Sequence, residues 1–195
     1  MSDKPVVIGD PGPLGLTAFG LTTVILSLIN AAVLPGAIMT VVLQLALVFG
    51  GSAQVLAGMW EFRKGNTFGA TAFTSYGAFW ISFYLLVNNI GSMKTDAGIG
   101  VGIYLLMWGV FTLYMFIGTF YINKALFFIF LFLLVTFILL ALGNFSGSAG
   151  TTALGGWFGL ITGILALYAA AAGIVNSVAG KTAWPVGGAF IKSNS

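Results

Sequence analysis

Residues 125–142 read ALFFIFLFLLVTFILLAL, a run of 18 positions in which Thr136 is the one polar side chain. A helix that crosses a bilayer needs about 20 predominantly apolar residues, so this run has nearly the length of one membrane span. The charge-free stretch that contains it covers residues 125–180, which are 56 positions without Lys, Arg, Asp or Glu. That length predicts two spans, with the turn between them in the Gly- and Ser-rich segment 143–150.

The rest of the chain has the same character. It has 195 residues, of which 59% are hydrophobic and 6% are charged, and its mean hydropathy is +1.07. Soluble domains carry about 25% charged residues. So few charges cannot solvate the surface of a chain of this length, which excludes a water-soluble globular protein. The composition therefore predicts an all-α membrane protein whose outer surface faces lipid.

The number of spans follows from the charge-free stretches, because a charge at the centre of a bilayer costs about 2.5–3.5 kcal/mol even on the most permissive scale. There are four such stretches, at residues 11–60, 65–93, 97–123 and 125–180. The first, like the last, is long enough for two spans, and its Pro35-Gly36 pair predicts the turn. We therefore expect a bundle of six transmembrane helices at about residues 14–34, 37–62, 68–90, 99–121, 125–142 and 153–178.

The basic residues predict the orientation of these helices. Six spans place both termini on one side, and that side then collects all the basic residues except Lys94. Its members are Lys4, Arg63, Lys64, Lys124, Lys181 and Lys192. Basic residues concentrate on the cytoplasmic side, so we expect a multi-pass protein of the inner cell membrane. We expect a cytoplasmic N-terminal segment at 1–13, a six-helix transmembrane domain at 14–178 and a cytoplasmic tail at 179–195. Residues 1–13 lack an apolar core, so the first helix should serve as its own insertion signal.

Two of the expected helices carry a polar stripe that starts at a large apolar side chain. The stripes consist of Phe19, Thr23, Ser27 and Asn30 on the first helix, and of Leu133, Thr136, Leu140 and Asn144 on the fifth. In each stripe the Asn lies eleven residues, or about 16 Å, beyond the bulky residue. We interpret the stripes as the lining of a pore and their bulky ends as a narrow hydrophobic gate. Gln54 on the second helix is a further candidate for the lining.

Small residues indicate where helices approach closely. Gly155, Gly159 and Gly163 form a ridge on the sixth helix, and Gly50 and Gly58 flank Gln54 on the second. In membranes such spacings are typical of helix–helix contacts. The ridges predict close packing, either within one chain or between copies of it. A symmetric ring is plausible for a pore built from a bundle this thin.

The amino-acid composition argues against several classes of function. The chain has no Cys and no His, which predicts neither a metal site nor a cofactor and leaves no buried acid–base pair for an enzyme. Its net charge of +3 comes from scattered residues, which gives no basis for a nucleic-acid partner. Asp10 and Glu61 are expected at the membrane edge, with Glu61 near Lys64 for an ion pair or a cap. Since no base is expected at depth, we hypothesise that a coupled proton would travel on the solute, or that the solute would flow passively down its anion gradient.

The uncharged stripes also limit the solute. It should be small and polar, and either neutral or held by hydroxyl, amide and backbone N–H donors. A pore for urea, a small amide or water would have the same features. A structural or signalling membrane protein without any flux remains a third alternative, since it could have the same composition.

Residues 10–16 read DPGPLGL and are followed by Phe19. They resemble the motif Asn-Pro-x-Pro-Leu-Gly-Leu, followed by Phe, that opens the acetate uptake transporter family. The matching residues are Asp10, Pro11, Pro13, Leu14, Gly15 and Leu16. The similarity continues through Gly50, Gly51, Ala53 and Gln54, residues 64–68, 71–77, 79–80 and 108–112, and Gly143, Asn144 and Trp157. One position departs, since the motif's opening Asn is Asp10 here. An ionised Asp accepts hydrogen bonds but donates none and would repel a carboxylate, although it can still cap the first helix.

The resemblance implies a six-helix protomer in a hexameric ring in the membrane lipid, with one pore in each protomer. It implies passage of acetate and related short monocarboxylates, with succinate in some members. The constriction would be formed by Phe19, Tyr76 and Leu133, two of which begin the polar stripes. Ala166 corresponds to a position that shapes substrate size.

Overall fold

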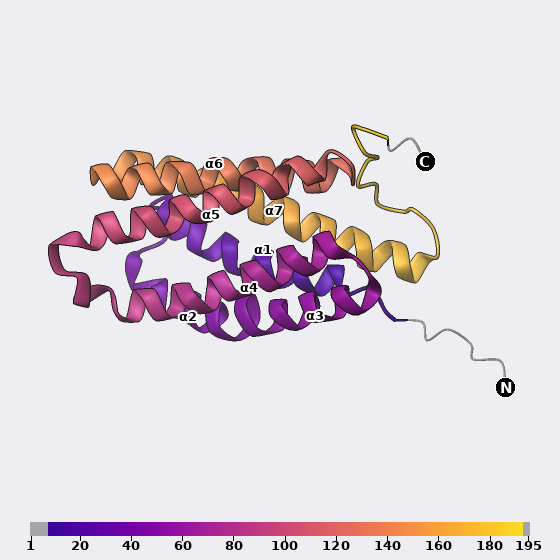
Figure 1. Cartoon of the computed structure of the whole chain (residues 1–195), viewed down its shortest axis with the longest axis horizontal. Coiled ribbons are helices and arrows are strands. Elements are labelled where there is room, and N and C mark those ends of the chain that lie inside the picture. The colour runs from indigo at the N-terminus through magenta and orange to yellow at the C-terminus, as the bar shows by residue number, and fades with distance from the viewer. Residues whose placement is uncertain (1–7, 193–195) are drawn as a thin grey trace.

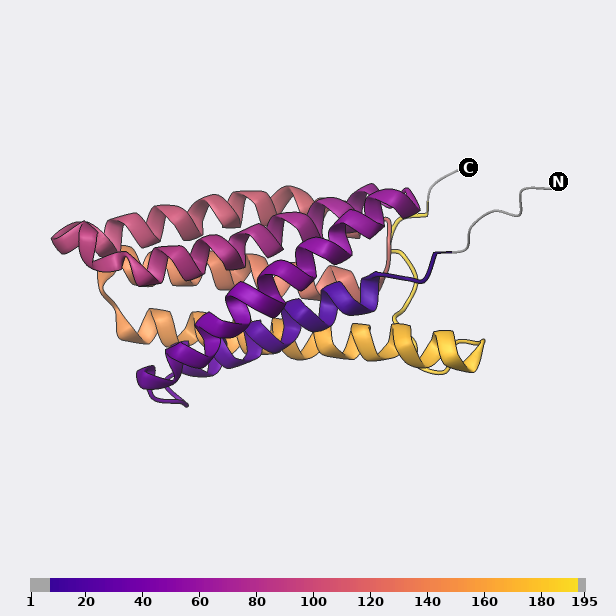
Figure 2. The same cartoon turned by 90° about the horizontal axis from the view of Figure 1, so that it is seen from below.

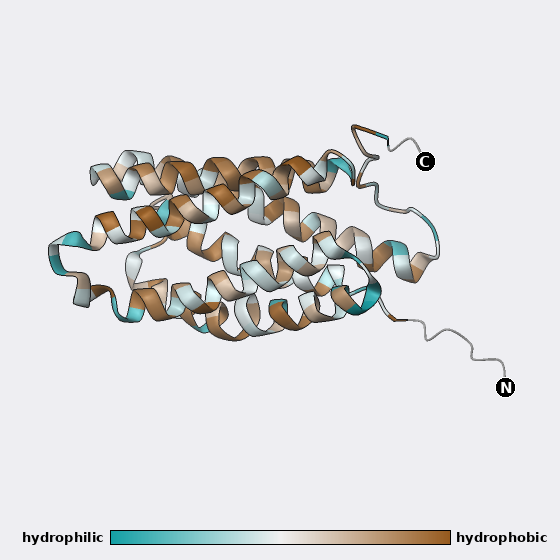
Figure 3. Ribbon diagram, viewed as in Figure 1, coloured by the Kyte–Doolittle hydropathy of each residue, from teal (hydrophilic) through white to brown (hydrophobic). Residues whose placement is uncertain are grey.

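The computed structural model of the chain describes residues 8–192. Figure 1 shows a bundle of long helices that lie side by side, with both ends of the chain at the same end of the bundle. Within the described residues, six helical segments are long and apolar enough to span a membrane, which confirms the expected number. They are Gly12–Asn30, Gly36–Lys64, Thr67–Asn88, Ile90–Thr119, Lys124–Ser146 and Ala149–Ala179. Hydrophobic residues cover most of these helices (Figure 3).

The first span is helix α1, Gly12–Asn30. Pro13 occupies its first turn, where a missing N–H costs nothing, and Asp10 Oδ1 accepts a hydrogen bond from Gly12 N at 3.0 Å. The helix ends four residues before the expected Leu34, because Ala32 adopts a left-handed backbone conformation with φ 58°. The N–H groups of Val33 and Leu34 then turn back to the carbonyl of Leu28.

The second span is not a continuous α-helix, contrary to expectation. A short 3₁₀ turn, Gly36–Ile38, leads into α2, Met39–Leu47, and a π-helical turn, Val48–Ala53, separates α2 from α3, Gln54–Lys64. A side chain at Gly50 would collide with Thr22 of α1, and one at Gly51 would lie 2.6 Å from Ile81 Cγ1 of α4, Thr67–Asn88. The glycine pair therefore lets α1 and α4 approach the widened turn, and the spacing in the sequence does not reveal that turn.

Three of the four remaining spans begin at a polar side chain that caps the helix. Asn66 accepts from Gly69 N at the start of α4, Thr67–Asn88, and Asn123 accepts from Leu126 N at the start of α6, Lys124–Ser146. Between them, the 3₁₀ segment Ile90–Asp96 leads into α5, Ala97–Thr119. These caps satisfy backbone N–H groups that a helix start leaves unpaired.

The turn before the last helix is shorter than expected. Helix α6 continues to Ser146, and α7, Ala149–Ala179, begins after only Gly147 and Ser148. The predicted boundaries of this turn, residues 143 and 150, are thus both wrong, because the turn consists of residues 147 and 148. Gly147 adopts a left-handed conformation with φ 66°, which glycine tolerates, so one residue is enough to end α6.

Glycines set the tightest contacts within the bundle, where α1 packs most extensively against α7, and α6 packs against both α5 and α7 (Figure 2). A Cβ at Gly155 would lie 2.9 Å from the Leu140 side chain of α6, and one at Gly163 would lie 3.1 Å from the Gly20 carbonyl of α1. The predicted glycine ridge of the sixth span is therefore used inside one chain. It brings the stripe-bearing helices α1 and α6 against the same face of α7, where a Cβ at Gly159 would meet both Ser27 and Thr136.

The segment after α7 returns to the α5–α6 turn. Phe190 N donates to the Phe120 carbonyl at 2.9 Å, and Ala125 N donates to the Val186 carbonyl at 2.9 Å. This segment therefore packs at the end of the bundle that holds both termini (Figure 1).

Candidate functional site

Two cavities lie inside the bundle. The larger one, here called the distal cavity, has a volume of about 700 Å³ and reaches the turns at the end away from the termini. Its polar lining includes the predicted stripe residues Thr23, Ser27, Asn30, Thr136 and Asn144. The lining contains no charged side chain among the described residues. The structure therefore brings the two stripes to one space.

The smaller one, here called the termini-side cavity, has a volume of about 260 Å³. Gln54 lines this cavity rather than the distal one, at the point where α3 begins after the π-helical turn. The lining also holds the ionisable side chains Asp10, Glu61 and Lys64. The two cavities therefore differ in kind, since one is polar but uncharged and the other carries charge.

Phe19 and Leu133 line both cavities, which makes them the dividing point between the two spaces. Tyr76 lines the termini-side cavity, and its ring centroid lies 5.7 Å from that of Phe19. The three side chains expose 5%, 4% and 3% of their surfaces and belong to one hydrophobic cluster. The predicted constriction residues thus lie together, at the level where one cavity ends and the other begins.

The phenol of Tyr76 is held by helix α5. Its hydroxyl lies 2.9 Å from Thr112 Oγ1, and Thr112 in turn donates to the Trp108 carbonyl at 2.7 Å. Because the Thr112 proton is used in that bond, the Tyr76 hydroxyl is the donor of the pair. The ring also packs edge-on against Phe111 at 5.2 Å. Its polar atom is therefore satisfied by α5, and the dividing point is lined by apolar surface.

Three fully buried polar atoms of cavity-lining residues have no hydrogen-bond partner within residues 8–192. Thr23 Oγ1 and Trp80 Nε1 belong to residues of the distal cavity, and Gln54 Oε1 belongs to a residue of the termini-side cavity. Buried polar atoms are normally paired, so an unpaired one needs an explanation such as an absent ligand or water. A hydroxyl and an indole N–H are both hydrogen-bond donors that suit an oxygen-rich solute.

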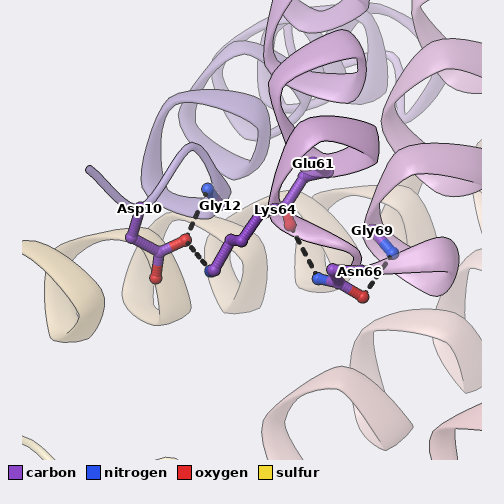
Figure 4. A network of polar contacts seen from close by, with 6 residues as sticks. All are labelled: Asp10, Gly12, Glu61, Lys64, Asn66 and Gly69. Atoms are coloured by element: carbon purple, nitrogen blue, oxygen red, sulfur yellow. Dashed lines mark hydrogen bonds and ion pairs between the residues drawn. The ribbon is translucent and has the colours of Figure 1, made fainter. Parts of the chain in front are cut away.

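A polar network occupies the mouth of the termini-side cavity (Figure 4). Lys64 Nζ lies 2.8 Å from Asp10 Oδ1, so the expected pairing of Lys64 with Glu61 is wrong. Glu61 instead accepts a hydrogen bond at 2.8 Å from Asn66 Nδ2. It exposes 1% of its surface, so this carboxyl in the last turn of α3 is buried inside the protein. Partial burial alone would raise the pKa of Asp10, but the hydrogen bonds from Lys64 and Gly12 N and the Lys64 charge together hold it below its ordinary value.

Three helix N-termini meet at the termini-side cavity. Its lining includes Gly12 at the start of α1, Gly69 in the first turn of α4 and Leu126 in the first turn of α6. The positive end of a helix dipole favours negative charge, by about 0.3–1 kcal/mol at exposed sites. Asp10 is the carboxylate already placed at one of these ends, and its charge is balanced by Lys64.

Other predicted residues serve packing. Gly15 of the opening motif lies against α4, since a Cβ there would be 2.6 Å from the Phe73 ring, and Pro13 contacts Gly173 of α7. Leu14 faces outward with 45% of its surface exposed. Ala166 is fully buried and, among the described residues, is not in the lining of either cavity.

The spacing of residues along the helices does not indicate that Glu61 and Asn66 line a cavity. The available signal was charge, because Glu61 is the one glutamate among four acidic residues and lies at the end of the second expected span. Its burial could not be read from that position. It depends on how α1 and α4 pack around α3.

The fold and the site define a six-span membrane protein with two opposed internal cavities. The family model described as the GPR1/FUN34/yaaH family matches residues 3–186, and the chain belongs to this family. It is 43% identical over 182 residues to the succinate-acetate/proton symporter SatP of Escherichia coli K12, which covers 92% of this chain and 96% of that protein. It is 40% identical to ammonia transport outward protein 2 of Saccharomyces cerevisiae, over 85% of this chain and 61% of that protein.

A solved structure has the same architecture. The structure of the bacterial acetate channel SatP superposes with a TM-score of 0.87 at 43% identity and covers 93% of this chain and all of that one. The expectation of an acetate-transporter relative is therefore confirmed at the level of the family. These relatives are named as transport proteins and not as enzymes.

Proposed function

We propose that this chain forms a pore or carrier for acetate and related short monocarboxylates, with succinate as a further solute. The observation that carries the proposal is the pair of cavities that meet at Phe19 and Leu133. A solute that enters from either side has to pass these two side chains and Tyr76. The names of the relatives, which include acetate, succinate and proton, support the choice of solute.

An anion would be attracted without a fixed binding cation. The N-termini of α1, α4 and α6 line the termini-side cavity, and the N-terminus of α7 at Ala149 lines the distal one. Their dipoles favour a carboxylate on both sides of the constriction. Hydroxyl and indole donors such as Thr23 and Trp80 add hydrogen bonds that a short carboxylate can accept.

Selectivity would be steric at the constriction. The apolar surfaces of Phe19, Tyr76 and Leu133 offer no polar partner to the charged head group of the solute. A short solute therefore loses its polar partners over only a short part of the path. Longer acids would have to displace these side chains. Ala166 would act on substrate size indirectly, through the packing of α7.

A small neutral solute is the alternative. The distal cavity is uncharged, and one yeast relative is named for ammonia transport, so urea or ammonia would also suit the lining. Counterflow of labelled acetate against excess unlabelled urea separates the two solutes.

We further propose that both termini are cytoplasmic, with residues 1–13 and 179–195 flanking the membrane domain 14–178 in the inner membrane. The support is the basic residues that collect at the end with the termini. The chain has no Cys, so single cysteines at Lys181 and Gly91 would report sidedness with an impermeant thiol reagent on intact cells. Labelling at residue 181 but not at residue 91 would contradict the proposed orientation and place both termini outside the cell.

We propose a homo-hexameric ring as the assembled form, with one pore in each protomer. Large apolar side chains remain exposed on α3, α5 and α7, including Trp60, Met107 and Trp157, and they can contact either lipid or another copy. Native mass spectrometry from detergent measures the number of copies directly. A monomer that still transports acetate would contradict the ring while leaving the pore intact.

Uptake of radiolabelled acetate into proteoliposomes tests the function. Protein-free liposomes give the background, because acetic acid crosses bilayers by itself, and unlabelled lactate, succinate and urea serve as competitors. Protein-dependent uptake that acetate and lactate compete with supports the proposal. Folded protein without uptake above background across a range of pH would overturn it.

A further inference from the structure

We propose that Glu61 is a proton site of the protein, and that its neutral carboxyl donates a hydrogen bond to the solute carboxylate in the termini-side cavity. The proposal rests on the proposed transport of a carboxylate. It replaces the hypothesis that a coupled proton travels only on the solute.

The first observation is burial without a counter-charge. Glu61 exposes 1% of its surface, and its one hydrogen-bond partner in the described part of the chain is the neutral amide of Asn66. The nearest cation, Lys64, is engaged with Asp10 at 2.8 Å. A buried carboxylate without a paired cation carries a large desolvation cost, and the neutral acid avoids that cost.

The second observation is the arrangement of the two carboxyl oxygens. Oε2 accepts from Asn66 Nδ2, whereas Oε1 has no partner among residues 8–192 and belongs to a residue of the cavity lining. Asn66 is itself fixed, because its Oδ1 accepts from Gly69 N at the start of α4 (Figure 4). One oxygen of Glu61 is therefore held in place, and the other can carry a proton toward the cavity.

The third observation is the charge around this cavity. The other ionisable groups that line it are Asp10 on the segment before α1, Lys64 on α3 and the phenol of Tyr76 on α4. Asp10 and Lys64 balance each other, and the Tyr76 hydroxyl is bonded to Thr112. Within residues 8–192, an entering anion therefore meets no unpaired cation in this lining and is repelled by an ionised Glu61. A neutral Glu61 offers an O–H donor instead, so binding of the anion and of one proton would support each other.

Infrared difference spectroscopy of the purified protein tests the protonation directly. The chain has four acidic side chains, so the assignment needs few variants. Near about pH 7, where exposed carboxyls are ionised, we expect a protonated-carboxyl C=O band that shifts when ¹³C-labelled acetate is added. The band should be absent in Glu61→Gln and unchanged in Asp96→Asn, a matched change at an exposed carboxyl near the other end of the bundle. A wild-type spectrum without the band, or the same band in Glu61→Gln, would overturn the proposal.

Transport then separates this proposal from the function on which it rests. Gln retains an oxygen that can accept from Asn66 and an N–H that can donate to the solute, so Glu61→Gln should fold. Background-corrected acetate uptake by the wild type should fall by up to about ten-fold for each pH unit above the titration of Glu61, and uptake by Glu61→Gln should stay nearly flat. Wild-type protein without uptake contradicts the proposed function. Equal pH profiles in wild type and Glu61→Gln contradict the proton site alone and return the proton to the solute.

Discussion

The rings of Phe19 of α1 and Tyr76 of α4 lie 5.7 Å apart, at the level where the two cavities meet. Leu133 of α6 completes the barrier, since it lines both cavities as Phe19 does. Side chains from three helices thus form one apolar barrier. Its width depends on residues that are far apart in the sequence.

Removing one of these side chains should widen the barrier. Leu133→Ala should increase uptake of acetate and, more strongly, of larger acids such as succinate. It should also lower the free energy of unfolding by about 2–5 kcal/mol, as buried Leu→Ala changes do. Proteoliposome uptake and thermal unfolding measure the two effects. Met115→Ala is the matched control, because Met115 is similarly buried but, among the described residues, lines neither cavity. This variant should lose stability without any change in uptake. Equal uptake by the two variants would argue against the barrier.

The unpaired hydroxyl of Thr23 should contribute to solute binding rather than to stability. Thr23→Val removes a donor from the distal cavity and keeps the shape of the side chain. A hydrogen bond to a charged group is worth about 1.5–3 kcal/mol, so the KM for acetate should rise by roughly ten- to a hundred-fold. Thr22→Val is the control, since Thr22 is buried and donates to the Ala18 carbonyl. Among residues 8–192, Thr22 belongs to neither cavity lining. A KM that is unchanged in Thr23→Val would remove Thr23 from the path.

The Asp10–Lys64 pair should make stability depend on pH at the acidic end. The pKa of Asp10 is lower in the folded protein than the ordinary 3.8, so the pair contributes fully above 3.8 and is lost as the pH falls through the lower folded value. Both side chains are more than one-third exposed, at 38% for Lys64 and 54% for Asp10, so the contribution should be at most about 1 kcal/mol. Asp10→Asn keeps the cap on Gly12 and should remove this part of the pH dependence. Thermal unfolding of both proteins between about pH 6 and about pH 3 measures it, and identical curves would contradict it.

The contact between α1 and α7 should not tolerate a single methyl group. A Cβ at Gly156 would collide with the backbone of Asn30 and Ala31, which cannot rotate away as a side chain can. Gly156→Ala should therefore lower the free energy of unfolding by about 1–3 kcal/mol. Gly150→Ala, in the first turn of the same helix, has open space around it and should be neutral or slightly stabilising. Similar unfolding temperatures for the two variants would show that α7 can move away from α1.

Much of the fold could be predicted from the sequence. Charge-free length predicts the number of spans because the bilayer core has a fixed thickness, and four-residue spacing predicts which side chains share a face. The stripe residues of α1 and α6 do line one cavity. The ends of the helices were less predictable. Helix α6 continues into the Gly- and Ser-rich segment as far as Ser146, where Asn144 Nδ2 bonds the Leu140 carbonyl and α7 packs against Gly143.

Some of the site could not be predicted because it depends on contacts across long sequence separations. Lys64 lies three residues from Glu61 on the same helix, and local spacing favours that pair, yet it bonds Asp10, 54 positions away. The π-helical turn at Val48–Ala53 likewise needs α1 and α4 to press against Gly50 and Gly51.

Composition and helical period are therefore enough to predict that the chain lies in lipid, how many helices it has and which helix faces carry polar groups. The tertiary structure alone decided which faces meet, which carboxyl is paired and which is buried. The physical reason is that the free energy of a charge depends on its surroundings in three dimensions. Asp10 and Glu61 are the same kind of group at the same end of the bundle, but only Asp10 has a cation within hydrogen-bonding distance in the described residues.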